Sequence, residues 1–144
     1  MVVVSGMAAL GAGDRVEGAR FVNETALMKL IMVELGRCDD LRVFRNNVGA
    51  LTDVTGRVVK YGLAPGSADL LVILAPWGRA VFLEVKTDRK GSGQTGAQRN
   101  FEAVMKSLGA VYEVVRSVAE AKDVIGAVRE FTLSRSASGL ERVS

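Results

Sequence analysis

The stretch PGSADLLVILAPWGRAVFLEVK, residues Pro65–Lys86, decides the fold. Its two runs rich in Val, Ile, Leu and Phe flank Pro76-Trp77-Gly78, and apolar runs bounded by Gly and Pro are typical of a β-hairpin. The first run is apolar at every position from Leu70 to Leu74. A strand that is apolar on both sides belongs in the middle of a covered sheet. The stretch therefore predicts an α/β protein, a three-layer α/β/α sandwich around a mixed central β-sheet.

Three charged residues occupy the open end of this hairpin: Asp69 in the first run, and Glu84 and Lys86 in the second. A loop at Pro76-Trp77 places Asp69 opposite Glu84, and a loop at Trp77-Gly78 places Asp69 opposite Lys86. Because side chains alternate with a period of two, both registers bring all three to one face. Buried charges are costly unless they are paired or bind a metal. The spacing leaves two interpretations open, a structural ion pair and a divalent-metal site beside a lysine.

The residues Gly66-Ser67-Ala68-Asp69, followed after a turn by Glu84-Val85-Lys86, resemble the PD-(D/E)xK nuclease signature. Their surroundings resemble its VRR-NUC branch, the virus-type replication-repair nucleases. The further residues that carry this likeness are Arg45–Gly49, Tyr61–Gly66, Gln98 and Phe101. The likeness extends from about Asn23 to Val115, and it departs from the usual pattern at Ser67-Ala68.

This resemblance implies a restriction-endonuclease-like fold and a metal-dependent DNA endonuclease that hydrolyses phosphodiester bonds. The implied enzyme is structure-selective, similar to Holliday-junction resolvases, and works as a homodimer. Two alternatives stay open: a flap-, end- or restriction-like DNA nuclease, and a non-catalytic nucleic-acid-binding subunit with the same fold. The presence of Asp69, Glu84 and Lys86 together favours an enzyme, because a decayed site usually loses one of its residues.

The resemblance also assigns roles to individual residues. The catalytic residues are Glu24, Asp69, Glu84, Lys86 and Gln98. One or two Mg²⁺ or Mn²⁺ ions are held by Glu24, Asp69, Glu84 and the backbone carbonyl of Val85. The implied partner is branched or duplex DNA, for which the expected contacts are Arg45, Asn47, Lys60, Arg89 and Lys90.

Composition agrees with this chemistry. The 144-residue chain has no histidine and one cysteine, which excludes Ser-His-Asp and Cys-His catalysis, histidine metal sites, an internal disulfide and cysteine-rich zinc sites. Carboxylates, lysines, hydroxyls and an oxygen-preferring cation such as Mg²⁺ or Mn²⁺ remain. The formal net charge of +3 permits a polyanionic partner without requiring one.

A helix is predicted over Asn23–Leu35, because Leu27, Ile31 and Leu35 form one apolar stripe. Asn23 is the expected N-cap. Glu24 lies one turn before Leu27, on the inward face. It is either a first-turn acid that favours the helix dipole or an accessory acid of the metal site, and its position on the core side favours the second interpretation.

A second helix is predicted from Gly96 to Leu108, and its expected apolar positions are Phe101, Val104, Met105 and Leu108. Thr95 and Gln98 fit a capping box, whereas the resemblance gives Gln98 a place in the site. The two roles are expected to coexist only in part, because one side-chain amide cannot point both ways, and we favour the site.

The remaining segments complete the expected organisation. Residues 1–20 form a flexible N-terminal arm, 21–132 the nuclease domain and 133–144 a polar C-terminal tail. Strands are expected over Leu41–Arg45 and Val58–Tyr61, and a last helix over Ser117–Phe131, where Ser117 and Glu120 form a second capping box.

No membrane span or signal peptide is recognised in the sequence, so we expect a cytoplasmic protein of a bacterial or phage-infected cell that has no membrane partner. The dimer surface is expected at the exposed side of the first helix and at the N-terminal arm.

Overall fold

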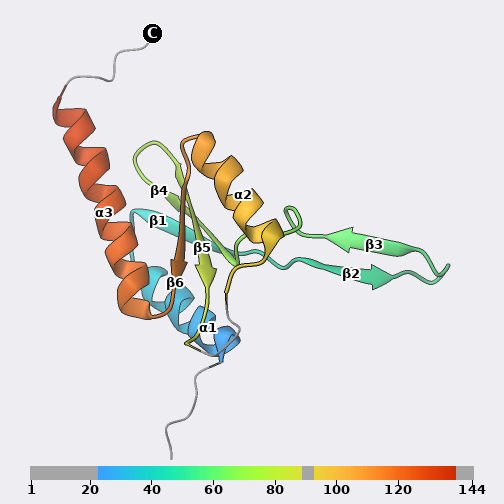
Figure 1. The fold of residues 1–144 in the computed structure, drawn as a ribbon. Helices are drawn as coiled ribbons and strands as arrows, with labels where there is room; N and C mark the ends of the chain where they lie inside the picture. Colours follow the sequence, from blue (N-terminus) through green and yellow to red (C-terminus); the bar gives the residue numbers. More distant parts are fainter. Residues whose placement is uncertain (1–22, 89–92, 139–144) are drawn as a thin grey trace, which may run out of the picture.

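The structure is a computed structural model, and it describes residues 23–88 and 93–138. These residues form three helices and six strands (Figure 1). In chain order the elements are α1 (Glu24–Leu35), β1 (Leu41–Arg45), β2 (Gly49–Thr52), β3 (Val58–Tyr61), β4 (Leu70–Leu74), β5 (Arg79–Val85), α2 (Gly96–Ser107), β6 (Val111–Val115) and α3 (Val118–Ala137).

Four strands form a mixed sheet in the order β1-β4-β5-β6. The β1–β4 and β4–β5 pairs are antiparallel, and the β5–β6 pair is parallel. The central hairpin pairs Leu71 with Phe82 and Leu70 with Leu83. This is the register expected for a loop at Pro76-Trp77, and the alternative register is wrong. The strands that are apolar on both sides lie in the middle of the sheet, as predicted.

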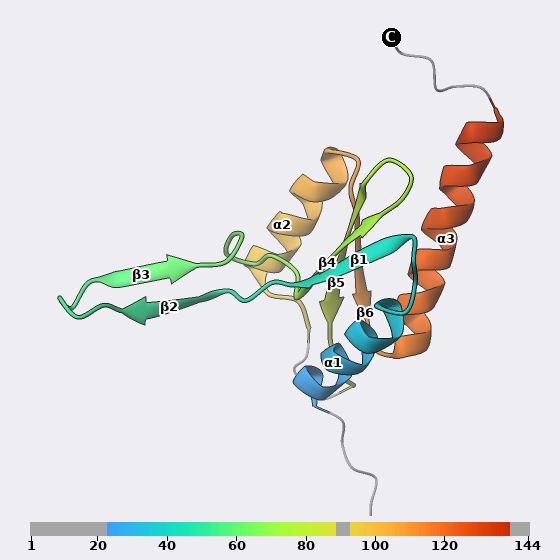
Figure 2. The same ribbon diagram turned by 180° about the vertical axis from the view of Figure 1, so that it is seen from behind.

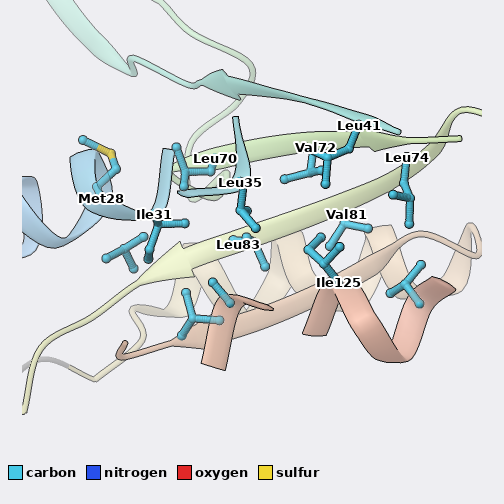
Figure 3. Close-up of a cluster of buried hydrophobic side chains, with 14 of the residues drawn as sticks. Met28, Ile31, Leu35, Leu41, Leu70, Val72, Leu74, Val81, Leu83 and Ile125 are labelled. Atoms are coloured by element: carbon cyan, nitrogen blue, oxygen red, sulfur yellow. The ribbon is translucent and has the colours of Figure 1, made fainter. Parts of the chain in front are cut away.

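Helices cover both faces of this sheet. On one face, α1 and α3 pack against β4 and β5, and the core there includes Ile31, Leu70, Leu83 and Ile125, each no more than 1% exposed (Figure 3). Burying one such side chain stabilises the fold by about 1.5–3 kcal/mol. The α/β class and the mixed sheet are therefore as predicted.

The other face is covered by α2. Phe101 of this helix contacts Phe82 edge-to-face, with 5.3 Å between ring centroids, and Met105 packs in the same cluster. The predicted inward positions Val104 and Leu108 are wrong, because these side chains are 45% and 74% exposed. Val104 lies beside the line of Phe101 and Met105 that faces the sheet, and Leu108 is the C-cap after the last turn.

The strands β2 and β3 form a separate antiparallel hairpin that projects away from the sheet (Figures 1 and 2). We call residues 49–61 the β-arm. Every residue from Ala50 to Leu63 is exposed, including Leu51 at 64% and Val59 at 52%. The sequence predicted the β3 strand but grouped it with the other strands of the domain and not with a separate hairpin.

The helix ends follow the predicted caps in part. The Asn23 side chain accepts a hydrogen bond from the Ala26 N–H at 2.8 Å, so Asn23 caps α1 as predicted. Ser117 caps α3, but the Glu120 carboxylate accepts from the Arg116 N–H instead of closing a capping box on Ser117.

The ends of the domain also differ from the expectation in one respect. The helix α3 continues to Ala137, past its predicted end at Phe131, so the first residues of the predicted 133–144 tail are helical. The predicted N-terminal arm, residues 1–20, lies outside the described residues. Within the described ranges, no helix is long and apolar enough to cross a membrane.

Candidate functional site

The candidate site lies where β4 begins and β5 ends, at one end of the central hairpin. Asp69 immediately precedes β4, Glu84 is in β5 and Lys86 immediately follows β5. The Asn46 N–H donates to the Asp69 carbonyl at 2.8 Å, which continues the β1–β4 pairing and holds Asp69 beside the end of β1, while the β4–β5 register places it near the end of β5. The structure therefore brings these three predicted residues together.

Glu84 is the centre of the site, and only 2% of it is exposed. Its Oε1 atom accepts hydrogen bonds from the Lys86 ammonium, at 2.9 Å, and from the Gln98 amide. Its Oε2 atom is buried and has no hydrogen-bond partner among the described residues. Burial raises the pKa of Glu84 above its ordinary value, and the nearby negative charge of Asp69 acts in the same direction.

Asp69 is held through one of its two carboxylate oxygens. Its Oδ2 accepts a hydrogen bond from the Val85 N–H at 2.9 Å. Burial nevertheless raises the pKa of Asp69 above its ordinary value. Since the N–H and C=O of one residue in a strand point to the same side, the Val85 carbonyl also lies on the Asp69 side of β5.

Lys86 stays a cation in this site. Burial alone would lower the pKa of its ammonium, but the hydrogen bond with Glu84 and the charges of Glu24 and Asp69 outweigh burial and raise it. Lys86 thus neutralises part of the negative charge that the three acids concentrate here.

Gln98 performs in full the two roles that were expected to coexist only in part. The Gln98 Oε1 atom accepts a hydrogen bond from the Thr95 N–H at 2.8 Å, and the backbone N–H of Gln98 donates to the Thr95 hydroxyl. These two bonds complete the capping box of α2. Its Nε2 meanwhile donates to Glu84. The expectation that the two roles compete was wrong, because the oxygen and the nitrogen of one amide bind different partners here.

The approach of α2 to the site depends on Gly66, which has φ = +80°. A Cβ added at this position would collide with the carbonyl group of Ala97 and with the Gln98 backbone nitrogen. Glycine is therefore needed both for the left-handed backbone and for the close contact with α2. Gly66 belongs to the motif Gly66-Ser67-Ala68-Asp69, but the motif alone does not predict this contact with α2.

Asn46 fixes the other side of the same loop. Its amide donates to the Ser67 hydroxyl, at 2.6 Å, and to the Ala68 carbonyl, at 2.9 Å, and its Oδ1 accepts from the Leu63 N–H at 3.3 Å. The side chain is therefore used in positioning the segment that carries Asp69. The motif Asn46-Asn47 was the sequence signal for this role, which the sequence analysis did not assign.

A cleft of about 530 Å³ opens beside Asp69. It lies between the start of α1, the segment after β1 and the base of the β-arm. Glu24 is exposed and lines this cleft instead of the core, because it opens the first turn of α1, ahead of the first buried position, Leu27. The residues that line the cleft include Glu24, Arg45, Asn47, Tyr61 and Asp69.

The residues predicted to contact nucleic acid are distributed unevenly. Arg45 and Asn47 line the cleft. Lys60 is exposed on the β-arm and does not line it. Arg89 and Lys90 lie outside the described residues.

The donor set suits a hard divalent cation. The unpartnered Oε2 of Glu84, the second oxygen of Asp69 and the Val85 carbonyl are all oxygen ligands, as Mg²⁺ and Mn²⁺ prefer. The described residues contain no group of three or more Asp, Glu, His or Cys side chains close enough to form a complete metal site by themselves. Mg²⁺ commonly uses one or two carboxylates and completes its shell with water and phosphate oxygens.

Comparison of the chain with models of protein families, with curated proteins and with solved structures found no match. The assignment of function therefore depends on the geometry of the site and on the motifs in the sequence.

Proposed function

We propose that this protein is a metal-dependent DNA endonuclease with a restriction-endonuclease-like fold, of the VRR-NUC type. The observation that carries the proposal is the buried Glu84, whose Oε2 has no hydrogen-bond partner among the described residues, next to Asp69 and Lys86. A buried, unpaired carboxylate oxygen is costly. A cation bound at this position removes that cost, which supports a metal site over a purely structural ion pair.

The residues have separate roles in this proposal. Asp69, Glu84 and the Val85 carbonyl would hold the cation, and Glu24, which lines the cleft beside Asp69, would add a further carboxylate. Bound Mg²⁺ or Mn²⁺ supplies a water of lowered pKa and offsets negative charge on the phosphate. Lys86 donates hydrogen bonds to the attacking water and to the phosphate oxygens.

Gln98 acts as a positioning residue. Because its amide is fixed by Thr95 at one end, the other end holds Oε1 of Glu84 in place. Oε2 of Glu84, which has no hydrogen-bond partner among the described residues, would then be the oxygen available to a cation. A glutamate at position 98 could still accept from Thr95 but could not donate to Glu84.

The proposed substrate is DNA, cleaved by a homodimer in the manner of a junction resolvase, with a flap- or end-directed nuclease as the alternative. Arg45 and Asn47 supply contacts in the cleft next to Asp69. The proposed dimer surface includes α1, on which Leu30 and Val33 are 50% and 57% exposed. The mass of the particle in solution, measured by light scattering, tests this part of the proposal.

The test of the activity is cleavage of labelled four-way, flap and duplex DNA with Mg²⁺ or Mn²⁺. We expect Asp69→Asn, Glu84→Gln and Lys86→Met to lower the rate at least about 100-fold, since each removes a metal ligand or a charge at the reacting phosphate. The matched control is Glu113→Gln, an exposed carboxylate of β6 in the same sheet.

If all three site variants cleave DNA at the wild-type rate, the proposed nuclease activity is refuted. The alternative of a non-catalytic DNA-binding subunit then remains. Calorimetry with Mn²⁺ distinguishes the metal-dependent enzyme from the non-catalytic subunit without the use of DNA. Wild-type protein should bind the ion, and Glu84→Gln should bind it more weakly.

A further inference from the structure

The cleft beside Asp69 has an aromatic wall that metal chemistry does not require. Tyr61, the last residue of β3, lines it. Its ring lies against Gly49 of β2, where an added Cβ would collide with the ring and the hydroxyl of Tyr61. The ring is therefore supported by the backbone, yet 45% of the residue is exposed. The result is a fixed aromatic surface in the same cleft as a proposed metal ligand.

Polar groups in the cleft complement this surface. Arg45 is exposed and carries the only positive charge among the described residues that line the cleft. Asn47 is exposed, and its side chain makes no hydrogen bond to any described residue. This contrasts with Asn46, whose amide is fully used in the loop. Guanidinium groups bind phosphate, and asparagine amides pair with the edges of bases.

The charges of the cleft favour a base over a second phosphate. Glu24 and Asp69 place two carboxylates around the same space as Arg45, so the cleft offers one cation for one backbone phosphate and repels any further phosphate. A nucleobase is neutral, its ring stacks on an aromatic side chain, and its amino groups donate to carboxylates or amide oxygens. The volume of about 530 Å³ is within the range of about 300–1,000 Å³ that is usual for small-ligand sites.

We propose that this cleft binds one nucleobase that has left the helical stack, with its ring on Tyr61, its edge at Asn47 and its backbone at Arg45. This inference rests on the proposed function and narrows its substrate class. The DNA that is cut has an unpaired nucleotide next to the scissile phosphate, as at a flap, an end or an opened branch point. A base inside a fully paired duplex does not reach Tyr61, because its faces are occupied by its neighbours.

The test measures binding first, in EDTA, with a short fluorescent single strand and with a blunt duplex of the same length. Tyr61→Leu keeps an apolar cover over Gly49 but removes the aromatic face. It should weaken single-strand binding by roughly 5- to 150-fold, the equivalent of the ~1–3 kcal/mol that stacking contributes per base. Duplex binding should not change. Tyr61→Phe, which keeps the ring, should bind like the wild type.

Val59→Ala is the matched control, because Val59 is on the same face of the β-arm and is 52% exposed, but it does not line the cleft. It should leave single-strand binding unchanged. Thermal unfolding of each variant verifies that the fold is retained. Equal losses in Tyr61→Leu and Tyr61→Phe, or equal losses for both DNAs, would overturn the inference.

Cleavage in Mg²⁺ separates this inference from the proposed function. If the wild type cuts paired duplex as fast as flap or single-stranded DNA, the base site is refuted and the nuclease stands. If no DNA is cut but single-strand binding depends on the Tyr61 ring, the nuclease is refuted and the base site stands.

Discussion

The four-stranded sheet and the β-arm are built from similar residues but have opposite environments. Both contain a β-hairpin rich in apolar side chains, β4–β5 in the sheet and β2–β3 in the arm. Leu83 of β5 is fully buried, whereas Leu51 of β2 is 64% exposed. An isolated two-stranded hairpin is marginally stable in water. The sheet therefore determines the stability of the protein, and the arm provides surface at the site.

The largest effect expected from this difference is on the free energy of unfolding. Leu83→Ala removes a side chain from the core between β5 and the α1–α3 layer, and it should lower the unfolding free energy by about 2–5 kcal/mol. Leu51→Ala should change it by less than about 0.5 kcal/mol, as is usual for exposed sites. Urea unfolding followed by circular dichroism measures both. Similar losses in the two variants would mean that the arm is packed in solution.

Two glycines with nearly the same backbone provide a sharper comparison. Gly66 beside the sheet has φ = +80° and Gly56 at the tip of the arm has φ = +83°. Alanine at either position pays about 1–2 kcal/mol for the left-handed conformation. At Gly66 it also meets the backbone of Ala97, while at Gly56 no atom lies within 4 Å.

Gly66→Ala should therefore cost about 1–3 kcal/mol more than Gly56→Ala, the range of overpacking penalties. It should also reduce DNA cleavage, because α2 must move and Gln98 then loses Glu84. Unfolding curves and cleavage rates of the two variants provide the measurement. Equal losses of unfolding free energy would show that α2 moves away from position 66 without an energetic penalty, contrary to its close contact with Gly66.

The smallest expected effect is a difference in the pH at which Asp53, in the β-arm, and Asp69, beside the sheet, bind a proton. Hydrogen bonds from the Thr55 hydroxyl and the Arg57 N–H lower the pKa of Asp53, in the arm, below its ordinary value of 3.8. Burial raises the pKa of Asp69 above the same ordinary value. As the pH falls in the absence of divalent ions, Asp69 should bind its proton above pH 3.8 and Asp53 below it.

Carboxyl chemical shifts followed by NMR measure this order. Because the pKa of Asp53 is lowered, the stabilisation of the β-arm by the hydrogen bonds of Asp53 is fully present above pH 3.8. It is lost as the pH falls through the lowered pKa. Asp53→Asn should remove this acid response at the Thr55 amide and leave Asp69 unchanged. The reverse order of protonation would contradict the burial of the site.

The sequence predicted most of the central sheet because its signals are local. The apolar run Leu70–Leu74 and the turn at Pro76-Trp77-Gly78 were sufficient for the hairpin and for the grouping of Asp69 with Glu84. The choice between the two registers required the structure, since both placed the same residues on one face. What these residues do chemically stays a prediction.

The features that sequence analysis missed depend on packing between distant segments. Apolar spacing alone could not show that α2 faces the sheet through Phe101 and Met105 and leaves Val104 exposed. Nor could strand propensity show that β3 belongs to a projecting arm, because propensity does not specify a partner surface. The double use of Gln98 requires the exact distance between α2 and β5, which Gly66 controls.

The parallel pairing of β5 with β6 has a topological consequence. A chain that leaves β5 at Val85 has to travel back along the sheet before β6 can begin in the same direction, and α2 makes this return. The first turn of α2 thus begins near the carboxyl end of β5, where the Gln98 side chain reaches Glu84 and the positive end of the helix dipole lies near that buried acid. Connectivity, and not only side-chain choice, therefore sets a helix dipole beside the negative charge of the buried Glu84.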